Sequence, residues 1–248
     1  MNWYRPVAVP TELADDLVTG WTAQVGGAHR LVPDGCVDVL WIDGGRLVLC
    51  GPETSAWSFQ FPAGTAAVGV RFQPGRAGSV FGLHTAEIRD RRVELDALLG
   101  SRDSRQLAER IDEADGVDAK LAVLGGRVRS WLTRAPSNDP IAAAVAELLR
   151  NDPSLPVGAL AERIGVGARQ LHRRCLAAFG YGPATLRRIL RLQRFLRLAR
   201  QPGAPVSLAG LAVLAGYTDQ PHLSHDCREL ANASPRELVG RTLRDDIP

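Results

Sequence analysis

The sequence predicts an α+β fold: an N-terminal antiparallel β sheet or small barrel with accompanying helices, followed by an all-α C-terminal domain. Three observations support this prediction. Between residues 37 and 72, short segments of β-branched and apolar residues are joined by tight turns, as in antiparallel sheets. From residue 141 onward, apolar residues recur at helical spacing. The segment 135–140 is dense in turn-forming residues, which predicts a linker between a domain at 1–136 and a domain at 137–248.

Five strands are expected in the N-terminal domain, at residues 17–25, 37–42, 46–50, 57–61 and 66–72. The best-defined pair is joined by residues 43–45, whose sequence Asp-Gly-Gly is a tight-turn signal. Residues 57–61 alternate with period two, as a half-buried strand does. Residues 62–64 contain proline and glycine, so we expect them to turn the chain between the last two strands.

Helices are expected after these strands. Short helical segments are predicted at 77–83 and 94–99, and longer helices at 104–114 and 117–134. The two longer helices carry apolar residues at spacings of three and four, which places them on one face. These faces could pack either on the sheet or on a second copy of the chain.

Seven helices are expected in the C-terminal domain, at residues 141–150, 157–164, 168–179, 183–200, 207–215, 220–230 and 235–241. Pro183 lies at a favoured first-turn position, and Ser207 is expected to cap the helix that follows it. Residues 201–205 include two prolines and a glycine, so we expect them to separate the fourth helix from the fifth.

A short pattern occurs twice within these helices. The first copy has Leu160-Ala161, Gly165, Leu171, Cys175 and Pro183, and the second has Leu211-Ala212, Gly216, Leu223, Cys227 and Pro235. In both copies the glycine follows the first leucine by five residues, and the proline follows the second leucine by twelve. A helix, a glycine turn and a second helix form the plan of a helix-turn-helix, which lays its second helix in the DNA major groove. The pattern therefore predicts two such motifs, at about 157–180 and 207–231.

The paired leucines and cysteines should face inward, which leaves the opposite face of each second helix in solvent. The outward residues that we predict to bind DNA are Arg169, Gln170, His172 and Arg173 in the first copy, and Gln220, Pro221, Ser224, His225 and Arg228 in the second. Arginine can bind guanine through two hydrogen bonds, glutamine suits adenine, and arginine and serine also bind phosphates. The alternative interpretation is that these residues only form an ordinary solvated helix face. The second copy in matching register makes that interpretation much less favoured.

Charge is distributed unevenly between the two halves. Residues 1–136 hold 15 Lys and Arg against 17 Asp and Glu, a net charge of −2, whereas residues 137–248 hold 15 against 10, a net charge of +5. A basic C-terminal domain suits a polyanionic partner, because the release of counterions from phosphates favours binding.

The helix expected at 183–200 connects the two motifs. Its 18 residues span roughly 27 Å. With the helix radii added at each end, the two second helices could reach adjacent major grooves about 34 Å apart. Its arginines are Arg187, Arg188, Arg191, Arg194, Arg197 and Arg200. We expect some of them to contact backbone phosphates, the alternative being that they only keep the helix soluble.

The C-terminal domain, over about residues 137–242, resembles the AraC/XylS family of transcription regulators. The most specific element is the sequence Gly-Tyr-Thr-Asp-Gln-Pro-His-Leu-Ser at 216–224, followed by Ala-Ser-Pro at 233–235; the sequence Arg-Leu-Gln-Arg at 191–194 also resembles the family's linker helix. The resemblance places the base-reading positions on Arg169, His172, Arg173, Gln220, Pro221 and His225. Cys175 and Cys227 depart from the family, which commonly has phenylalanine there, and His225 and Gly167 replace a basic and a capping residue.

The segments 33–38, 51–54 and 69–75 resemble the N-terminal domain of one AraC-type subgroup, which implies a regulatory domain without indicating a ligand. Trp41, Trp57, Phe59 and Arg71 could line a pocket for a small apolar or anionic effector, or they could be core residues. Cys36 and Cys50 could be redox-active across the hairpin, or simply buried thiols. His29, Asp34, Cys36 and Asp38 match no strong metal-ligand spacing, so no metal is expected.

The composition is that of a soluble globular protein, with 45% hydrophobic and 23% charged residues. The N-terminus has no apolar signal core, so we expect a cytoplasmic protein with reduced cysteines. No nucleophile, base and acid set is apparent, so we expect neither an enzyme nor a cofactor.

The predicted function is a sequence-specific, DNA-binding transcription regulator controlled by a signal sensed in the N-terminal domain. Double-stranded DNA and an unknown small-molecule effector are the expected partners, with RNA polymerase and a second copy of the chain as further candidates. The alternative is an enzyme or small-molecule-binding protein whose C-terminal half is only a helical scaffold.

Overall fold

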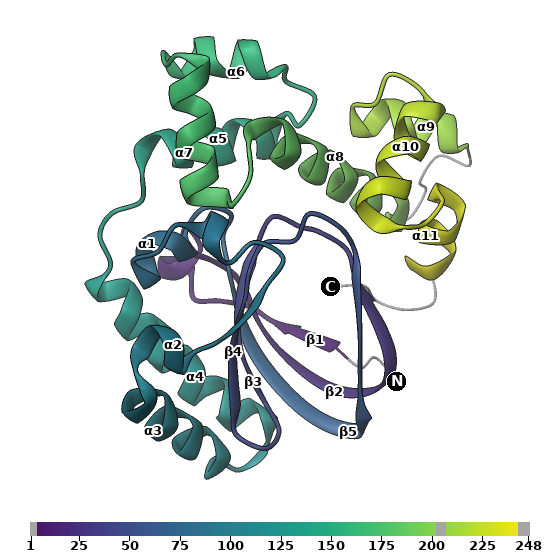
Figure 1. Ribbon diagram of the computed structural model, residues 1–248. Coiled ribbons are helices and arrows are strands. Elements are labelled where there is room, and N and C mark those ends of the chain that lie inside the picture. Colours follow the sequence, from purple (N-terminus) through teal and green to yellow (C-terminus); the bar gives the residue numbers. More distant parts are fainter. Residues whose placement is uncertain (1–3, 202–206, 243–248) are drawn as a thin grey trace.

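The computed structural model describes residues 4–201 and 207–242. Figure 1 shows two parts, a sheet with its own helices and a cluster of helices stacked on one end of it. The predicted break at 201–205 lies almost entirely outside the described residues. Among the described residues, no helix combines the length and the apolar character needed to cross a membrane.

The N-terminal part is a six-stranded antiparallel sheet with the strand order β1-β2-β5-β3-β4-β6. The strands are β1 Tyr4–Val7, β2 Leu17–Leu31, β3 Val37–Ile42, β4 Arg46–Cys50, β5 Trp57–Phe72 and β6 Arg92–Glu94. Since β1 and β6 lie at opposite edges and do not pair, the sheet is open, so of the predicted sheet or small barrel the structure forms the sheet. The α+β class and the hairpin of β3 and β4 are confirmed.

The two longest strands differ from their prediction. Segments 57–61 and 66–72 form the single strand β5, so the turn predicted at 62–64 is wrong. Gly64 has a φ of 85°, and the pairing of β2 with β5 changes register between Val25 and Gly27. Glycine inside a strand pattern marks a bulge as well as a turn, and here it lets a long pair of strands bend.

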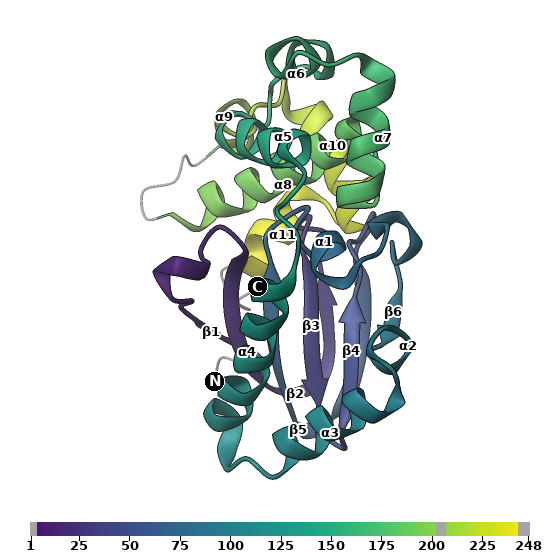
Figure 2. The same cartoon turned by 90° about the vertical axis from the view of Figure 1, so that its left-hand side faces the viewer.

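One face of the sheet is covered by helices. These are α1 Ala77–Phe81, α2 Asp96–Leu99, α3 Ser101–Asp112 and α4 Gly116–Arg134, with the 3-10 turns η1 Thr11–Leu13 and η2 Thr85–Glu87 in the connections. Figure 2 shows α3 and α4 lying along the sheet. Leu124 and Val128 of α4 are fully buried in the same cluster as Val39 and Phe72. Of the two options for these apolar faces, the structure therefore uses the sheet, and a dimer would need other residues.

The C-terminal part is all-helical, as predicted. Its helices are α5 Pro140–Asn151, α6 Val157–Ile164, α7 Ala168–Phe179, α8 Pro183–Arg200, α9 Leu208–Ala215, α10 Gln220–Ala231 and α11 Pro235–Thr242. Every predicted helix is present, with bounds that agree to within one residue. Leu186, Ile189, Leu192 and Phe195 of α8 are fully buried, which makes α8 the centre of this core.

The two parts are joined by more than the linker. Val32, in the loop between β2 and β3, is buried in the core of the C-terminal helices. Beside it, Gln193 Nε2 of α8 donates a hydrogen bond to the Pro33 carbonyl oxygen at 2.7 Å. At the other end of the contact, the Ala56 backbone N–H donates to the Leu230 carbonyl oxygen of α10 at 2.6 Å. Loops of the sheet therefore contact both α8 and α10.

Candidate functional site

Helices α6 and α7 form the first helix-turn-helix. The helix α6 ends at Gly165, whose φ of 75° is a left-handed conformation that glycine adopts without steric cost. Leu160 of α6 and Leu171 and Cys175 of α7 are fully buried. This apolar contact fixes the angle between the helices and leaves the opposite face of α7 in solvent.

Helices α9 and α10 repeat this plan. Gly216 ends α9 with a φ of 92°, and Leu223 and Cys227 of α10 are fully buried. The start of α10 is the better capped of the two, because Asp219 Oδ1 accepts a hydrogen bond from the His222 backbone N–H at 2.7 Å. Gly167, at the matching position before α7, has no side chain to do this.

Most of the residues that we predict to bind DNA are exposed on the outer faces of α7 and α10. The exposed ones are Arg169, Gln170, His172, Arg173, Gln220, Pro221, His225 and Arg228, and Ser224 is half-buried. His172 also packs against the turn before α8, because a Cβ added at Gly182 would lie 2.8 Å from its ring. The geometry thus presents one set of polar side chains from each motif.

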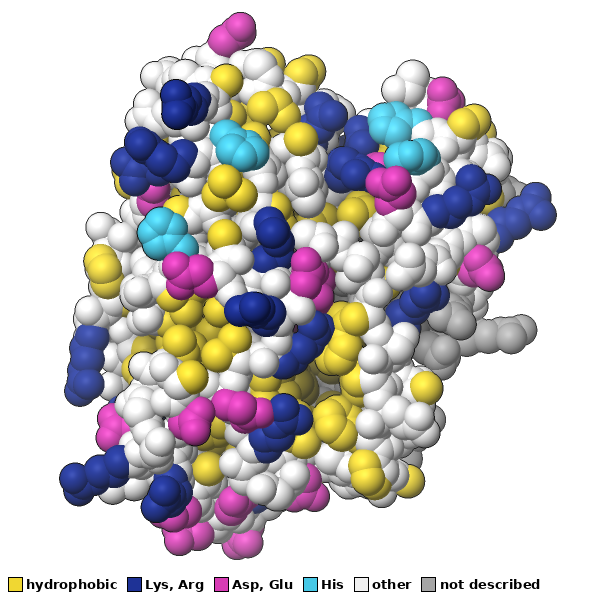
Figure 3. Space-filling model, viewed as in Figure 1, with side chains coloured by type: hydrophobic (Ala, Val, Ile, Leu, Met, Phe, Trp, Pro, Cys, Tyr) yellow, Lys and Arg dark blue, Asp and Glu magenta, His cyan; other side chains and the backbone are white. Residues whose placement is uncertain are grey.

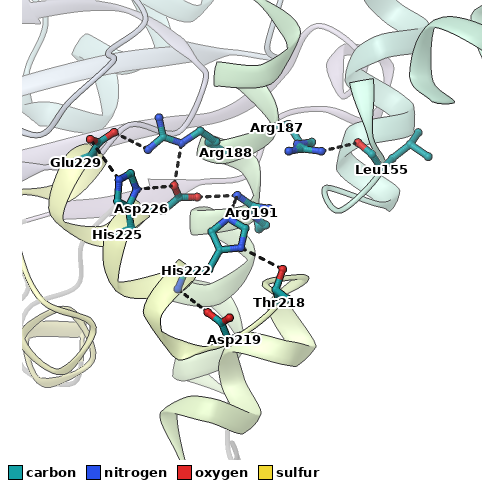
Figure 4. Close-up of polar contacts among 10 residues, drawn as sticks. All are labelled: Leu155, Arg187, Arg188, Arg191, Thr218, Asp219, His222, His225, Asp226 and Glu229. Carbon is teal, nitrogen blue, oxygen red and sulfur yellow. Dashed lines mark hydrogen bonds and ion pairs between the residues drawn. The ribbon is translucent and has the colours of Figure 1, made fainter. Parts of the chain in front are cut away.

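The helix α10 is tied to α8 by a buried carboxylate. Asp226 is 2% exposed, and its two oxygens accept hydrogen bonds from Arg188 Nε and from Arg191 Nη2, both at 2.8 Å. Arg188 Nη2 also donates to Glu229 Oε2 at 2.8 Å. Figure 4 shows these side chains converging between the two helices, with His225 beside both acids. Paired on both oxygens, the buried charge of Asp226 fixes how α10 sits on α8.

This arrangement changes the expectation for the connector helix. Arg191 is 4% exposed and held by Asp226, so it is not among the arginines available for phosphate contacts, which the prediction assigned to only some of the six. Arg188 is likewise engaged with Asp226 and Glu229. The arginines of α8 that stay exposed are Arg197 and Arg200. Phosphate contacts from α8 are therefore limited to a part of the predicted set.

His222 belongs to the same internal network. Its Nε2 lies 3.1 Å from Arg191 Nη2, and its Nδ1 lies 3.4 Å from Thr218 Oγ1. Burial, reinforced by the charge of Arg191, lowers the pKa of His222, which suits a neutral ring that accepts a hydrogen bond from the guanidinium. His222 thus faces inward, while His225 of the same helix is exposed.

Sequence reasoning missed Asp226 as the anchor of α10. A signal was present, because Asp226 lies directly before Cys227 and three residues after Leu223, on the stripe that faces inward. A carboxylate on an inward stripe needs a charged partner, and Arg188 and Arg191 of α8 are spaced three residues apart, on one side of that helix.

The second face of the sheet borders a cavity of about 320 Å³. Its lining includes Trp57, Phe59 and Arg71, three of the four residues predicted to form an effector pocket. Figure 3 shows apolar side chains gathered in a hollow there, with acidic and basic side chains around them. Trp41 is the fourth, and its placement is wrong: it is fully buried on the helix-covered face, where Lys120 lies 4.7 Å from its ring centre.

Charged side chains line one part of this cavity. Arg71 Nε donates to Asp38 Oδ2 at 3.1 Å, and Arg71 Nη1 lies 3.1 Å from Asp34 Oδ2. A second pair joins Arg92 Nη2 and Glu53 Oε1 at 2.5 Å. Burial raises the pKa of Asp38 even though Arg71 opposes the shift, and burial raises the pKa of Glu53 to about 7. Asp34, Asp38, Glu53 and Arg92 were not predicted as part of a pocket.

Cys36 and Cys50 line the same cavity as free thiols. Burial raises the pKa of the Cys36 thiol well above its usual range and that of Cys50 to about 12, which disfavours the reactive thiolate. Within the described ranges, no group of three or more His, Cys, Asp or Glu side chains is arranged to hold a metal ion. The redox reading of these cysteines stays a prediction.

Comparison with known families matches two segments of the chain. Residues 160–241 match a helix-turn-helix domain, and residues 10–94 match a domain of unknown function, DUF6597. Among curated proteins the comparison finds no match.

Several solved structures are similar. An apo form of ToxT from Vibrio cholerae covers 90% of this chain and 96% of its own, at 11% identity and a TM-score of 0.50, a likeness of fold. An AraC-type transcriptional regulator from Chromobacterium violaceum has 27% identity over 41% of this chain and 91% of its own, with a TM-score of 0.38. With two helix-turn-helix units on one central helix, a matching domain family over residues 160–241 and the signature at 216–224, the chain is a DNA-binding transcription regulator of AraC type, preceded by a domain of the DUF6597 family.

Proposed function

We propose that this regulator binds double-stranded DNA sequence-specifically, with α7 and α10 in adjacent major grooves. The observation that carries the proposal is the pair of equivalent helices whose inner faces share one core with α8 and whose outer faces carry exposed polar side chains. A connector of 18 residues supports simultaneous insertion, because its roughly 27 Å, together with the helix radii at each end, is comparable to the about 34 Å between successive grooves.

The two helices are proposed to contribute differently. Arg169 and Arg173 give α7 two guanidinium groups that can bind guanine edges or phosphates. On α10, Gln220 can bind adenine, and His225 lies within 3.6 Å of Glu229, which offsets positive charge at that face. We infer that α7 supplies more of the affinity and that α10 mainly supplies register and discrimination.

Arg169→Ala and Gln220→Ala test this proposal. A cognate duplex is first selected from a random-sequence library with the full chain, and affinity is then measured by fluorescence anisotropy. Each variant should weaken binding to the selected duplex by about 1–3 kcal/mol and lose less on random DNA. Arg102→Ala, which removes an exposed arginine from α3, is the matched control and should bind like the unmodified chain.

Two outcomes would contradict the proposal. An equal loss of affinity on selected and random duplexes would remove base reading by these residues. An affinity that does not fall as salt rises would remove phosphate binding altogether, because neutralised phosphates release counterions.

The N-terminal domain, at 1–136, is proposed to hold a small-molecule effector in the cavity bordered by β5. A volume of about 320 Å³, mostly apolar walls and a few converging charged groups are typical of small-ligand sites. Val32 supports a direct route to the DNA-binding domain at 137–248, because it lines the cavity and is also buried among the C-terminal helices. A ligand in the cavity would therefore touch the loop that contacts α8.

A second copy of the chain and RNA polymerase are proposed as further partners, without a specific binding surface for either. Homodimerisation is checked by light scattering with and without the selected duplex; since the apolar face of α4 packs on the sheet, a dimer would use other residues. Contact with RNA polymerase is checked by transcription from a promoter that carries the selected duplex.

A further inference from the structure

We propose that the cavity of the N-terminal domain takes a cationic molecule with an apolar, aromatic body and discriminates against anions. This inference rests on the proposed role of the cavity as the effector site. It follows from the aromatic walls of the cavity, from the two carboxylates that share the guanidinium of Arg71, and from the existing ion pairs of the arginines in its lining.

Aromatic rings form a large part of the walls. Along β5, the ring centres of Trp57 and Phe59 are 5.2 Å apart, and those of Phe59 and Phe61 are 5.4 Å apart. On the strands β1 and β2, Tyr4 and Trp21 form a further pair at 5.7 Å. All five side chains line the cavity. Aromatic faces carry partial negative charge, so they attract a cation and also bury an apolar body.

Around Arg71 the acids outnumber the bases. Asp34 and Asp38 share the single guanidinium of Arg71, whereas Glu53 has Arg92 to itself. Beside Arg71, two carboxylates thus face one guanidinium group, so the pairing there is one positive charge short. Arg46 also borders the cavity, but its charge is taken by Glu94, outside the lining, at 2.6 Å.

The arginines of this part of the lining are already paired with carboxylates. Arg71 pairs with Asp38 through its Nε and with Asp34 through its Nη1. Arg92 is paired with Glu53 and stacked over Trp57, with the guanidinium carbon 3.5 Å from the ring centre. To bind either arginine, an anion would displace a carboxylate and leave that charge unpaired in a largely buried place, which is costly.

A cation has an accessible partner. The Asp34 side chain is 25% exposed, against 14% for Asp38, and it shares Arg71 with that second acid. A positively charged group beside Asp34 would complete the pairing of two acids with two bases, while the aromatic walls enclose the rest of the molecule.

Three probes with one ring system and different charge test this inference: 1-naphthylmethylammonium, 1-naphthylmethanol and 1-naphthylacetate. Their binding to the full chain is measured by isothermal titration calorimetry. We expect the ammonium to bind at least tenfold more tightly than the acetate, with the neutral alcohol between them. Asp34→Asn keeps an acceptor for the Cys36 backbone N–H but removes one negative charge, so it should reduce the ammonium-to-acetate preference about tenfold.

Controls separate the possible results. Asp103→Asn removes an exposed carboxylate from α3, on the other side of the sheet, and should leave the preference unchanged. Asp38→Asn gives a second measurement if Asp34→Asn lowers the thermal midpoint strongly. Tighter binding of the acetate, or a preference that neither substitution changes, would overturn the proposed charge class and leave the cavity as a binding site. Binding of none of the three probes would overturn both the charge class and the cavity, while DNA binding by α7 and α10 is measured independently.

Discussion

Helices α7 and α10 occupy equivalent places in two motifs of nearly identical spacing, but they are held in different ways. The residue before the shared cysteine is Arg174 in α7 and Asp226 in α10. Arg174 is 45% exposed and pairs with Asp139, the capping residue of α5, at 3.0 Å. Asp226 is buried and pairs with two arginines of α8. The same position thus serves a surface ion pair in one motif and a buried anchor in the other.

This difference shows that the spacing of the repeat determines the local fold but not which interactions, apolar packing or ion pairs, stabilise it. The helix α7 is held mainly by apolar packing and by the N-terminal domain, where Arg89 Nη1 donates to the Gly180 carbonyl oxygen at 3.0 Å just after α7 ends. The helix α10 is held by a charged network within the C-terminal domain. We therefore expect the two motifs to respond differently to matched substitutions.

The largest effect is expected from Asp226→Ala. Removing this carboxylate leaves Arg191 buried without its ionic partner, which should lower the free energy of unfolding by about 3–5 kcal/mol. Arg174→Ala, at the matching position of α7, should cost less than about 1 kcal/mol because its ion pair is exposed. Urea denaturation followed by circular dichroism checks both values, and similar losses for the two variants would break the comparison.

The next largest effect is expected on DNA affinity, from substitutions on the exposed outer faces of α7 and α10. Arg173→Ala and His225→Ala remove residues at matching positions, two before the shared cysteine. We expect Arg173→Ala to cost about 1–3 kcal/mol of affinity and, if it contacts a phosphate, to reduce the salt slope by about one. His225→Ala should cost less affinity but relax base preference more. Anisotropy titrations at several salt concentrations, with the selected duplex and single-base variants of it, measure both quantities.

A smaller effect on stability is expected from the capping residues at the start of α10 and of α7. Asp219→Ala removes the hydrogen bond to the His222 backbone N–H and should destabilise the chain by about 1 kcal/mol. Gly167→Ser adds a capping hydroxyl to α7 and should stabilise it by a few tenths of a kcal/mol. The two variants should therefore shift the thermal midpoint in opposite directions, and a midpoint that rises for Asp219→Ala would contradict the capping geometry.

The smallest effect is a pH dependence of folding stability that arises from His222 in α10. The pKa of His222 is lower in the folded chain than its ordinary value, so the unfolded chain takes up the proton first as pH falls below about 6.5. The stability contributed by neutral His222 is therefore present above that pH and is lost on acidification. His222→Gln keeps an acceptor for Arg191 and should flatten this part of the stability profile between pH 7 and pH 5. Ser224→Ala, a substitution without a titrating group on the same helix, should leave the profile unchanged.

The C-terminal helices could be predicted closely because their signals are local. Glycines with positive φ end α6 and α9, and Pro183 and Pro235 begin α8 and α11. Ser207 caps α9 and Asp219 caps α10, each through a backbone N–H three residues later. The exposed faces of α7 and α10 followed from the same periodicity. Local signals place Asp226 on the inward stripe but do not identify its partners, because the pairing joins residues 35 and 38 positions apart in the chain.

The N-terminal domain was harder for the same physical reason. Strand order depends on contacts between distant segments, and both faces of β3 are apolar, so alternation alone does not show which face meets the helices. Trp41 lies on the face opposite the cavity, so the prediction that it lines the pocket is wrong. Residues 62–64 contain the proline and glycine of a turn, but Phe61 and Thr65 on either side of them both pair with β2, which keeps the segment within one strand.

The burial of Val32 among the C-terminal helices affects whether the two domains would separate if the linker between them were cleaved. Cleavage at the linker between α4 and α5 would sever the backbone but leave Val32 in the C-terminal core and Pro33 bonded to Gln193. The two pieces would stay associated without a covalent bond. A C-terminal fragment produced alone would instead expose the apolar site that Val32 fills, which favours aggregation over a clean measure of DNA affinity.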